Sequence, residues 1–225
     1  MLTRYRAHHP GSSLPRMFFY DAFRECSLLI MRVIFRLRRR GVMNIPRSGP
    51  VLLIANHQSF LDPPIVTVFV RHRHADFLAR EGLFRFRPFG YVIGLLNSSP
   101  IKQGAGDTAA MKATIAKLKD GKMMLVFPEG ARTTDGKMHE FKRGIGVLLK
   151  RTDCQVVPVG IAGAYRAWPR TRKFPRLFNK SMAVVYGTPI NSKVLMENGV
   201  DQAISTLASE VGMLVRQAEA LRKGI

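Results

Sequence analysis

The amino-acid sequence predicts an α/β fold, with a mostly parallel central sheet flanked by helices. Short apolar runs with the length and branching of strands alternate with longer segments in which apolar residues recur at helical spacing. This alternation of strand, helix and strand favours parallel pairing. With 225 residues and a hydrophobic content of 46%, the chain is long enough for one domain with a sizeable core.

Residues 1–41 predict a basic amphipathic segment for membrane association. Residues 1–15 lack the apolar stretch and the cleavage site of a signal peptide. From Arg16 to Arg40 the pattern is helical, and charged residues interrupt it too often for a helix that spans a membrane. One apolar stripe recurs at steps of four and three residues: Phe19, Phe23, Cys26, Ile30, Val33 and Leu37. The run of three arginines at 38–40 closes the predicted helix.

This amphipathic segment has two compatible interpretations. Its apolar stripe packs on the rest of the chain, or it lies in the plane of an anionic bilayer with its arginines at the surface. The formal net charge of +21 implies a polyanionic partner, which is a nucleic acid, an anionic membrane surface or an acidic substrate. The composition alone does not choose among these partners.

The rest of the chain predicts strands and helices in alternation. The expected strands are 51–55, 75–79, 91–96, 123–127, 156–161 and 182–187. The expected helices are 65–70, 107–121, 144–151 and 200–223. Pro158 interrupts one of the strands, which suggests a sheet edge or an irregular strand end.

A polar cluster follows the first buried strand, and it contains His57 and Asp62. Pro63 and Pro64 can fix the loop or start a helix, so that the carboxylate turns back onto the imidazole. An imidazole held by a carboxylate is suited to general-base catalysis, because it can take a proton from a hydroxyl near neutral pH. Taken alone, this spacing is also common for residues with a capping or core role.

A second apolar run, 123–127, ends in Pro128, Glu129, Gly130 and Arg132. Charged groups at a strand end are costly to bury unless they hold something charged. The guanidinium of Arg132 offers a planar fork for phosphate, and Gly130 lets the backbone approach a ligand closely. A further cationic cluster, 141–144, includes Lys142 and opens a predicted helix. Ligands gather at the carboxyl ends of parallel strands, where both motifs fall.

Together, Asn56-His57-Gln58-Ser59-Phe60-Leu61-Asp62 and Phe127-Pro128-Glu129-Gly130-Ala131-Arg132-Thr133 resemble the motifs of the glycerolipid acyltransferase family, in particular the bacterial 1-acyl-sn-glycerol-3-phosphate acyltransferases. Two weaker blocks, 99–102 and 157–161, also fit in order. The resemblance runs from about Val42 to Pro189, which makes residues 42–225 the expected acyltransferase domain.

The resemblance implies a reaction and a set of roles. His57, oriented by Asp62, would deprotonate the free hydroxyl of a lysophosphatidate-like acceptor, which then attacks an acyl thioester to give phosphatidic acid. Glu129, Gly130 and Arg132 would shape the phosphate end. Lys102 stands where the family has an arginine and, with Lys142, would assist, although a solvated surface lysine is the alternative for Lys102. The donor would be acyl coenzyme A or acyl carrier protein.

Two positions depart from the family pattern. Ala131 replaces a threonine that is common there, and Thr133 stands where serine is usual. Another lysolipid acceptor is therefore an alternative to lysophosphatidate. The lipid substrate implied by the resemblance favours membrane contact for residues 1–41, at the cytoplasmic face of the cell membrane and in a peripheral or monotopic manner.

Other chemistries lack their motifs. His139-Glu140 is not followed by the second histidine of H-E-x-x-H, and no phosphate loop or G-x-S-x-G elbow occurs. Cys26 and Cys154 lie far apart, so neither a disulfide framework nor a cysteine metal site is expected. We expect no metal and no cofactor. A basic nucleic-acid-binding protein and a membrane-docking protein without turnover are the alternatives from other classes, but no nucleic-acid recognition motif appears and no nucleic-acid partner is expected.

Overall fold

The computed structural model describes residues 13–101, 106–178 and 180–225. Its strands, in chain order, are β1 (Arg38–Arg40), β2 (Val51–Ala55), β3 (Ala75–Arg80), β4 (Ser98–Ile101), β5 (Met123–Val126), β6 (Gln155–Ala162), β7 (Ala183–Tyr186) and β8 (Ile190–Asn191). Its α-helices are α2 (Leu14–Phe35), α3 (Asp62–Thr67), α4 (Arg87–Leu95), α5 (Gly106–Lys119), α6 (Gly144–Arg151), α7 (Ala164–Ala167), α8 (Ser192–Met196) and α9 (Gly199–Lys223). Two short 3₁₀ turns are η1 (Val42–Asn44) and η2 (Glu81–Phe84).

The strands of the described residues form one sheet in the order β1-β7-β6-β2-β5-β3-β4, with β8 paired to β6. Parallel pairs join β2 to β5 and β6, β3 to β4 and β5, and β1 to β7. Only the pairs that β6 makes with β7 and β8 are antiparallel among these described strands. The predicted α/β fold with a mostly parallel sheet is therefore confirmed.

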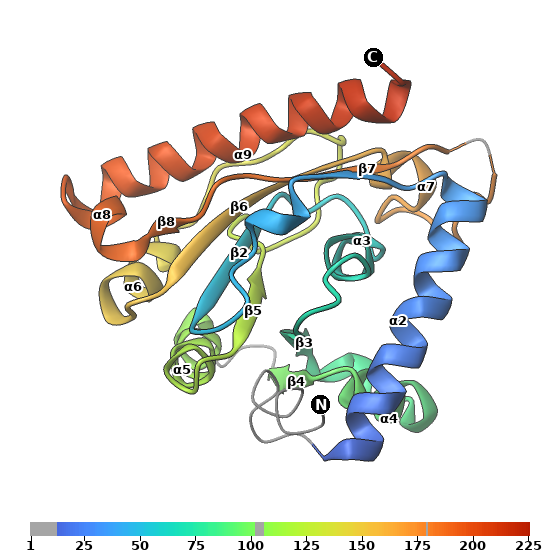
Figure 1. Ribbon diagram of the computed structural model, residues 1–225, viewed down its shortest axis with the longest axis horizontal. Coiled ribbons are helices and arrows are strands. Elements are labelled where there is room, and N and C mark those ends of the chain that lie inside the picture. Colours follow the sequence, from blue (N-terminus) through green and yellow to red (C-terminus); the bar gives the residue numbers. More distant parts are fainter. Residues whose placement is uncertain (1–12, 102–105, 179) are drawn as a thin grey trace.

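Helices cover both faces of the sheet (Figure 1). In β2 the residues alternate between two cores, with Val51, Leu53 and Ala55 facing one and Leu52 and Ile54 facing the other. The first core includes residues of α2, α3 and α7, and the second includes residues of α5, α6, α8 and α9. A strand buried on both faces reads as a continuous apolar run, which explains why 51–55 is recognisable in the sequence.

Helix α2 is apolar on two opposite faces. The face that packs on the sheet carries Met17, Tyr20, Leu28, Met31 and Phe35. The stripe predicted from the sequence lies largely on the other face, where Phe23, Ile30 and Val33 are exposed to 40%, 45% and 66%. Among the described residues, no helix has the length and apolar character needed to cross a bilayer.

The prediction that the first helix extends to Arg40 is wrong. Arg36 adopts a left-handed conformation with φ of 44°, which ends α2 after Phe35. The chain then pairs Arg38–Arg40 with Ala183, Val184 and Val185 as the edge strand β1. The arginine run is thus part of the sheet, and its side chains are exposed.

Two further predictions are corrected by the structure. Residues 91–96 were expected as a strand, but 91–95 belong to α4 and Leu96 caps its C-terminus. Pro88 lies in the first turn of this helix. Strand β6, which contains Pro158, is not at an edge, because β2 and β7 pair with its two sides. Gly160 allows α9 to cross this strand closely, since a Cβ at that position would lie 2.2 Å from the backbone of Leu214.

Strand directions define two ends of the sheet. Strands β2, β3, β5 and β6 run in the same direction, so their carboxyl ends meet at one end of the sheet. Strands β7 and β1 run the opposite way, so the carboxyl end of β1 lies at the other end of the sheet. The segments that follow Ala55, Arg80, Val126 and Ala162 are therefore neighbours in space.

Candidate active site

His57 and Asp62 form a hydrogen-bonded pair at the carboxyl end of β2. The distance from His57 Nδ1 to Asp62 Oδ2 is 2.8 Å. Asp62 is the first residue of α3, and Pro63 and Pro64 follow it in the first turn. The short loop between strand and helix therefore turns the carboxylate back onto the imidazole, as the spacing predicted.

Asp62 is fully buried, and one of its oxygens collects several donors. Besides the imidazole, Oδ2 accepts the backbone N–H groups of Gln58 at 2.5 Å and Ser59 at 2.7 Å. Burial raises the pKa of Asp62 above its ordinary value, and the hydrogen bonds from His57 and the two backbone groups oppose that rise. The carboxylate is consequently held in one position against the imidazole.

The contact to Asp62 leaves one imidazole nitrogen available. A carboxylate at Nδ1 favours the tautomer with the proton on Nδ1, which makes Nε2 the basic nitrogen. The ring also stacks on Phe127, with centroids 4.0 Å apart and planes at 12°. Its side chain keeps 19% of its surface exposed. The imidazole is thus fixed in orientation, yet a small molecule can reach it.

Two buried polar side chains position the His57 loop. Asn56 donates from Nδ2 to the Ile161 carbonyl at 3.0 Å, and its Oδ1 accepts the Ile161 N–H at 2.8 Å. Glu129 accepts the backbone N–H of His57 at 2.7 Å and that of His139 at 3.0 Å. Burial raises the pKa of Glu129, and these backbone hydrogen bonds oppose the rise. Asn56 and Glu129 therefore tie the ends of β2, β5 and β6 together.

The carboxylate of Glu129 contacts two backbone groups. The sequence placed Glu129 among the residues that shape the phosphate end of the acceptor. Each of its two oxygens instead accepts a backbone N–H, and a carboxylate would repel a phosphate. Through these contacts Glu129 positions the backbone of His57.

Arg132 lies beside the dyad with an unsatisfied guanidinium. Its Cζ lies 3.3 Å from the centroid of the Phe60 ring, and its buried Nη1 makes no hydrogen bond. The adjoining Thr133 donates its backbone N–H to the His57 carbonyl at 2.9 Å, which fixes Arg132 next to the imidazole. A buried donor without an acceptor is costly, so this group is poised for an anion.

The charges of two further arginines act on Arg132. Burial lowers the pKa of Arg132, and the positive charges of Arg170 and Arg80 lower it further. Arg80 ends β3, and Arg170 follows α7, so the three guanidinium groups come from three different strand ends. An anion beside Arg132 would offset this positive charge. The charges around Arg132 therefore favour an anionic ligand.

Gly130 and Lys142 are in contact. Gly130 has φ of 73°, and a Cβ on it would lie 2.7 Å from Cε and Nζ of Lys142. The lysine backbone N–H also donates to the Pro128 carbonyl at 2.9 Å. Gly130 thus makes room for the Lys142 side chain beside the loop that carries Arg132. Lys102 lies outside the described residues.

Ser59 is not bonded to the imidazole. Its hydroxyl donates to the Trp168 carbonyl at 2.8 Å and accepts the Leu61 N–H at 3.2 Å. The indole of Trp168 lies against Phe60, with ring centroids 5.2 Å apart. Ser59 therefore joins the loop after α7 to the His57 loop, and Phe60 and Trp168 form an aromatic wall beside Arg132.

Sequence reasoning missed several residues of this site. Arg80, Arg170, Phe60 and Trp168 are not among the site residues predicted from the sequence. The rule that ligands gather at the carboxyl ends of parallel strands would have drawn attention to Arg80. Within the described residues, no group of three or more His, Cys, Asp or Glu side chains could hold a metal ion.

Comparisons with known proteins identify relatives of the chain. A model of the acyltransferase family matches residues 36–162, more than half of the chain. The chain is 29% identical over 138 residues to a chloroplastic 1-acyl-sn-glycerol-3-phosphate acyltransferase of Arabidopsis thaliana. This match covers 60% of this chain and 38% of the relative. It thus spans well under half of that plant protein. A 1-acyl-sn-glycerol-3-phosphate acyltransferase of Streptococcus pneumoniae is 25% identical over 212 residues, which is 93% of this chain and 76% of the relative.

A solved structure has the same fold. The 1-acyl-sn-glycerophosphate acyltransferase PlsC of Thermotoga maritima superposes with a TM-score of 0.75 at 24% sequence identity. The match covers 97% of this chain and 88% of the other. The match in fold therefore extends over nearly the whole chain.

Proposed function

Because the chain belongs to the acyltransferase family, we propose that it transfers a fatty acyl group from an acyl thioester to the free hydroxyl of 1-acyl-sn-glycerol-3-phosphate, giving phosphatidic acid in phospholipid biosynthesis. The observation that carries this proposal is the position of Arg132. Its buried Nη1 has no hydrogen-bond partner and lies at the same end of the sheet as the His57 and Asp62 pair. A base and an anion site together suit an acceptor that has both a hydroxyl and a phosphate.

The dyad supplies the base. His57 Nε2 takes the proton of the acceptor hydroxyl as its oxygen attacks the thioester carbonyl carbon, and the buried Asp62 carboxylate stabilises the imidazolium. A new ester C–O bond forms and the C–S bond breaks. The thiolate then takes the proton from the imidazolium, which returns the dyad to its starting state. No covalent bond to the protein is needed.

The arginines hold the acceptor phosphate. Arg132 donates its free Nη1–H to a phosphate oxygen, and Arg80 and Arg170 add positive charge around it. Lys102 and Lys142 remain proposed as assisting cations. Holding the phosphate places the hydroxyl of the glycerol backbone within reach of the imidazole, and such positioning lowers the entropic part of the barrier.

The acyl donor is acyl coenzyme A or acyl carrier protein, and it enters as a co-substrate. The direct test is to incubate the purified protein with each donor and with lysophosphatidate on vesicles, and to measure phosphatidate and free thiol. We expect both products in equal amounts. Turnover with another lysolipid in place of lysophosphatidate would change the acceptor, and no acyl transfer to any lysolipid would contradict the proposal.

Removal of the Arg132 guanidinium tests the phosphate contact. We expect Arg132→Ala to lower kcat/KM for lysophosphatidate roughly 30-fold to 150-fold, because a charge-assisted hydrogen bond to phosphate contributes about 2–3 kcal/mol. Monoacylglycerol lacks the phosphate, so the wild type should acylate it more slowly. The same substitution should change that rate little. Steady-state kinetics with both acceptors checks this, and equal losses with the two acceptors would contradict the role of Arg132.

Contact with an anionic membrane surface is also part of the proposal. The face of α2 opposite the sheet exposes Phe23, Ile30 and Val33, and α2 lies along the right-hand edge of the molecule in Figure 1. The formal net charge of +21 favours an anionic surface. We propose that α2 lies in the membrane interface at the cytoplasmic face, as a peripheral or monotopic contact.

Loss of two exposed apolar side chains tests this contact. Ile30→Ser with Val33→Ser should weaken binding to anionic vesicles roughly tenfold, because each side chain then buries less apolar surface in the interface. The matched control is Val194→Ser with Met213→Ser, which removes exposed apolar groups from α8 and α9. Vesicle flotation measures the binding. An equal effect of the two double substitutions would contradict a specific role of α2.

A further inference from the structure

A basic pocket of about 480 Å³ lies away from the candidate active site. Four arginines line it together with a histidine and an aromatic ring: Arg39, Arg40, Arg47, Arg71, His72 and Phe69. None of the described residues that line the pocket is acidic. The carboxylate of Glu25, on α2, accepts a hydrogen bond from Arg71 at 2.5 Å and pairs with Arg24 as well.

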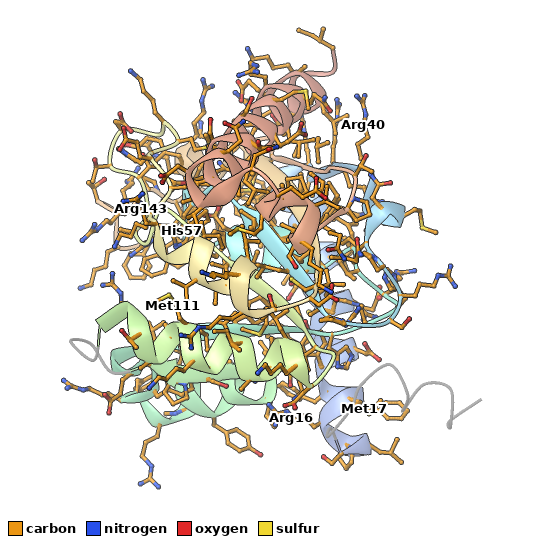
Figure 2. The ribbon with its side chains drawn as sticks, turned by 90° about the vertical axis from the view of Figure 1, so that its left-hand side faces the viewer. Arg16, Met17, Arg40, His57, Met111 and Arg143 are labelled. Atoms are coloured by element: carbon orange, nitrogen blue, oxygen red, sulfur yellow. The ribbon has the colours of Figure 1, made fainter. Side chains whose placement is uncertain are left out.

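The pocket and the His57–Asp62 pair are at opposite ends of the strands of the sheet. Arg39 and Arg40 lie at the carboxyl end of β1, which runs antiparallel to β2, whereas His57 follows the carboxyl end of β2. Figure 2 shows the same separation, with Arg40 on the right side of the molecule and His57 on the left. A ligand in this pocket is therefore not the acceptor bound at Arg132.

The walls of the pocket are held in place before any ligand binds. Arg39 and Arg32 lie over the ring of Phe69, with Cζ 4.9 Å and 5.6 Å from its centroid. The buried Arg73 donates to the carbonyls of Pro46 at 3.2 Å and Gly49 at 2.9 Å, which fixes the loop that carries Arg47. A pre-formed cationic pocket loses little entropy when it binds an anion.

The charges of the pocket point to a phosphate group. Guanidinium groups are weakly hydrated planar forks that bind phosphate oxygens in pairs. Glu25 offsets part of the charge of Arg71, while Arg39 and Arg40 remain on the exposed edge strand. Like charges gathered in one hollow repel each other, and an anion bound among them removes that repulsion.

Exposed apolar side chains beside the pocket point to a lipid. Met43 lines the pocket and is 74% exposed. Leu29, which is 64% exposed, lies on the same face of α2 as Glu25 and Arg32, because it is four residues after one and three before the other. A free phosphate makes no use of these groups, whereas a phospholipid presents acyl chains next to its phosphate.

We propose that this pocket is a second anion site, which binds the phosphate headgroup of an anionic membrane lipid. The assignment rests on the membrane contact in the proposed function, because the same helix, α2, carries the exposed apolar face and part of the pocket rim. The pocket would hold the protein on the bilayer through one lipid headgroup, while the acceptor occupies the site at the other end of the sheet.

The test compares vesicle binding by two variants with equal loss of charge. Arg40→Gln with Arg47→Gln removes two pocket guanidinium groups, and Lys150→Gln with Arg151→Gln removes two exposed charges at the end of α6. Binding to phosphatidylcholine vesicles that contain phosphatidate should weaken roughly 30-fold in the pocket variant, which corresponds to about 1 kcal/mol for each arginine. The control variant should bind within about twofold of the wild type. Equal binding by the two variants would overturn the proposal.

Inorganic phosphate separates the lipid from a free anion. The measurement is the thermal unfolding temperature of the wild type and the pocket variant, with phosphate added at constant ionic strength. If phosphate raises it in the wild type only, while both proteins bind vesicles equally, the pocket takes a free anion and the lipid assignment is overturned. If phosphate competes with the vesicles for the wild type, the lipid assignment is supported.

Failure of this proposal is distinguishable from failure of the proposed function. Vesicle binding requires no turnover, so His57→Ala should bind phosphatidate vesicles as the wild type does. A wild type that binds these vesicles more tightly than the pocket variant, yet forms no phosphatidate from lysophosphatidate, contradicts the reaction and supports the pocket. A wild type that turns over but binds vesicles no better than the pocket variant contradicts the pocket alone.

Discussion

Substitution of His57 by alanine should lower the rate of acyl transfer by roughly 100-fold to 10,000-fold, which is the contribution typical of a positioned general base. The imidazole is hydrogen-bonded to a buried carboxylate and 19% of its side-chain surface is exposed, so alanine removes the group that is placed to take the proton. Steady-state kinetics with a saturating acyl thioester and lysophosphatidate measures this loss. The loss should fall on kcat, because the base acts on the acceptor after it is bound.

A matched histidine serves as the control for this substitution. His139 lies at the same end of the sheet, and its ring is half exposed. Its ring is hydrogen-bonded to the Thr133 hydroxyl rather than to Asp62. His139→Ala retains the backbone N–H that Glu129 accepts, so it should keep most of the activity. Comparable losses in the two variants, or wild-type activity in His57→Ala, would contradict the assignment of the base.

Asp62→Asn should also lower kcat by about 100-fold or more, because a neutral amide cannot stabilise the imidazolium that forms when His57 takes the proton. The expected effect on stability has the opposite direction. Burial raises the pKa of Asp62 in the folded protein. A raised pKa means that this carboxyl contributes stability below its unfolded pKa and loses that contribution as pH rises through the folded value. At neutral pH the ionised carboxylate therefore opposes folding.

Removal of that charge should not lower the free energy of unfolding at neutral pH. In the Asp62→Asn variant, the amide oxygen of the new side chain can still accept the backbone N–H groups of Gln58 and Ser59. Thermal unfolding at neutral pH, measured beside the kinetics, checks both halves of the expectation. A variant that loses activity only because it unfolds would show a lower unfolding temperature, and this would remove the evidence that Asp62 acts through His57.

The sequence was most informative where structure depends on neighbouring residues. Strand β2 was predicted because it is buried on both faces and bounded by turn residues. Residues 91–96 were misread because a short apolar run does not distinguish a strand from a helix. Arg38–Arg40 is a strand only through pairing with β7, which lies far along the chain and leaves no local pattern. Helix α2 has two apolar faces, so its periodicity alone did not indicate which face packs.

In the candidate site, contacts between residues close in sequence were predictable, and contacts between residues far apart were not. His57 and Asp62 are five residues apart, so one loop and one helix start bring them together. Glu129 reaches the backbone of His57 across 72 residues, and the sequence therefore did not reveal that it positions the loop. Arg80 and Arg170 approach Arg132 from separate strand ends. Their convergence follows from strand order, which was not predicted.

The central claim is that the His57 and Asp62 pair makes the acceptor's own hydroxyl the nucleophile. The most direct measurement is thiol release from an acyl thioester in a single turnover, with and without lysophosphatidate, combined with the intact mass of the protein. The account predicts thiol release only when the acceptor is present, and an unchanged protein mass. A burst of thiol equal to the amount of protein in the absence of acceptor, with an acyl group added to the protein, would contradict it.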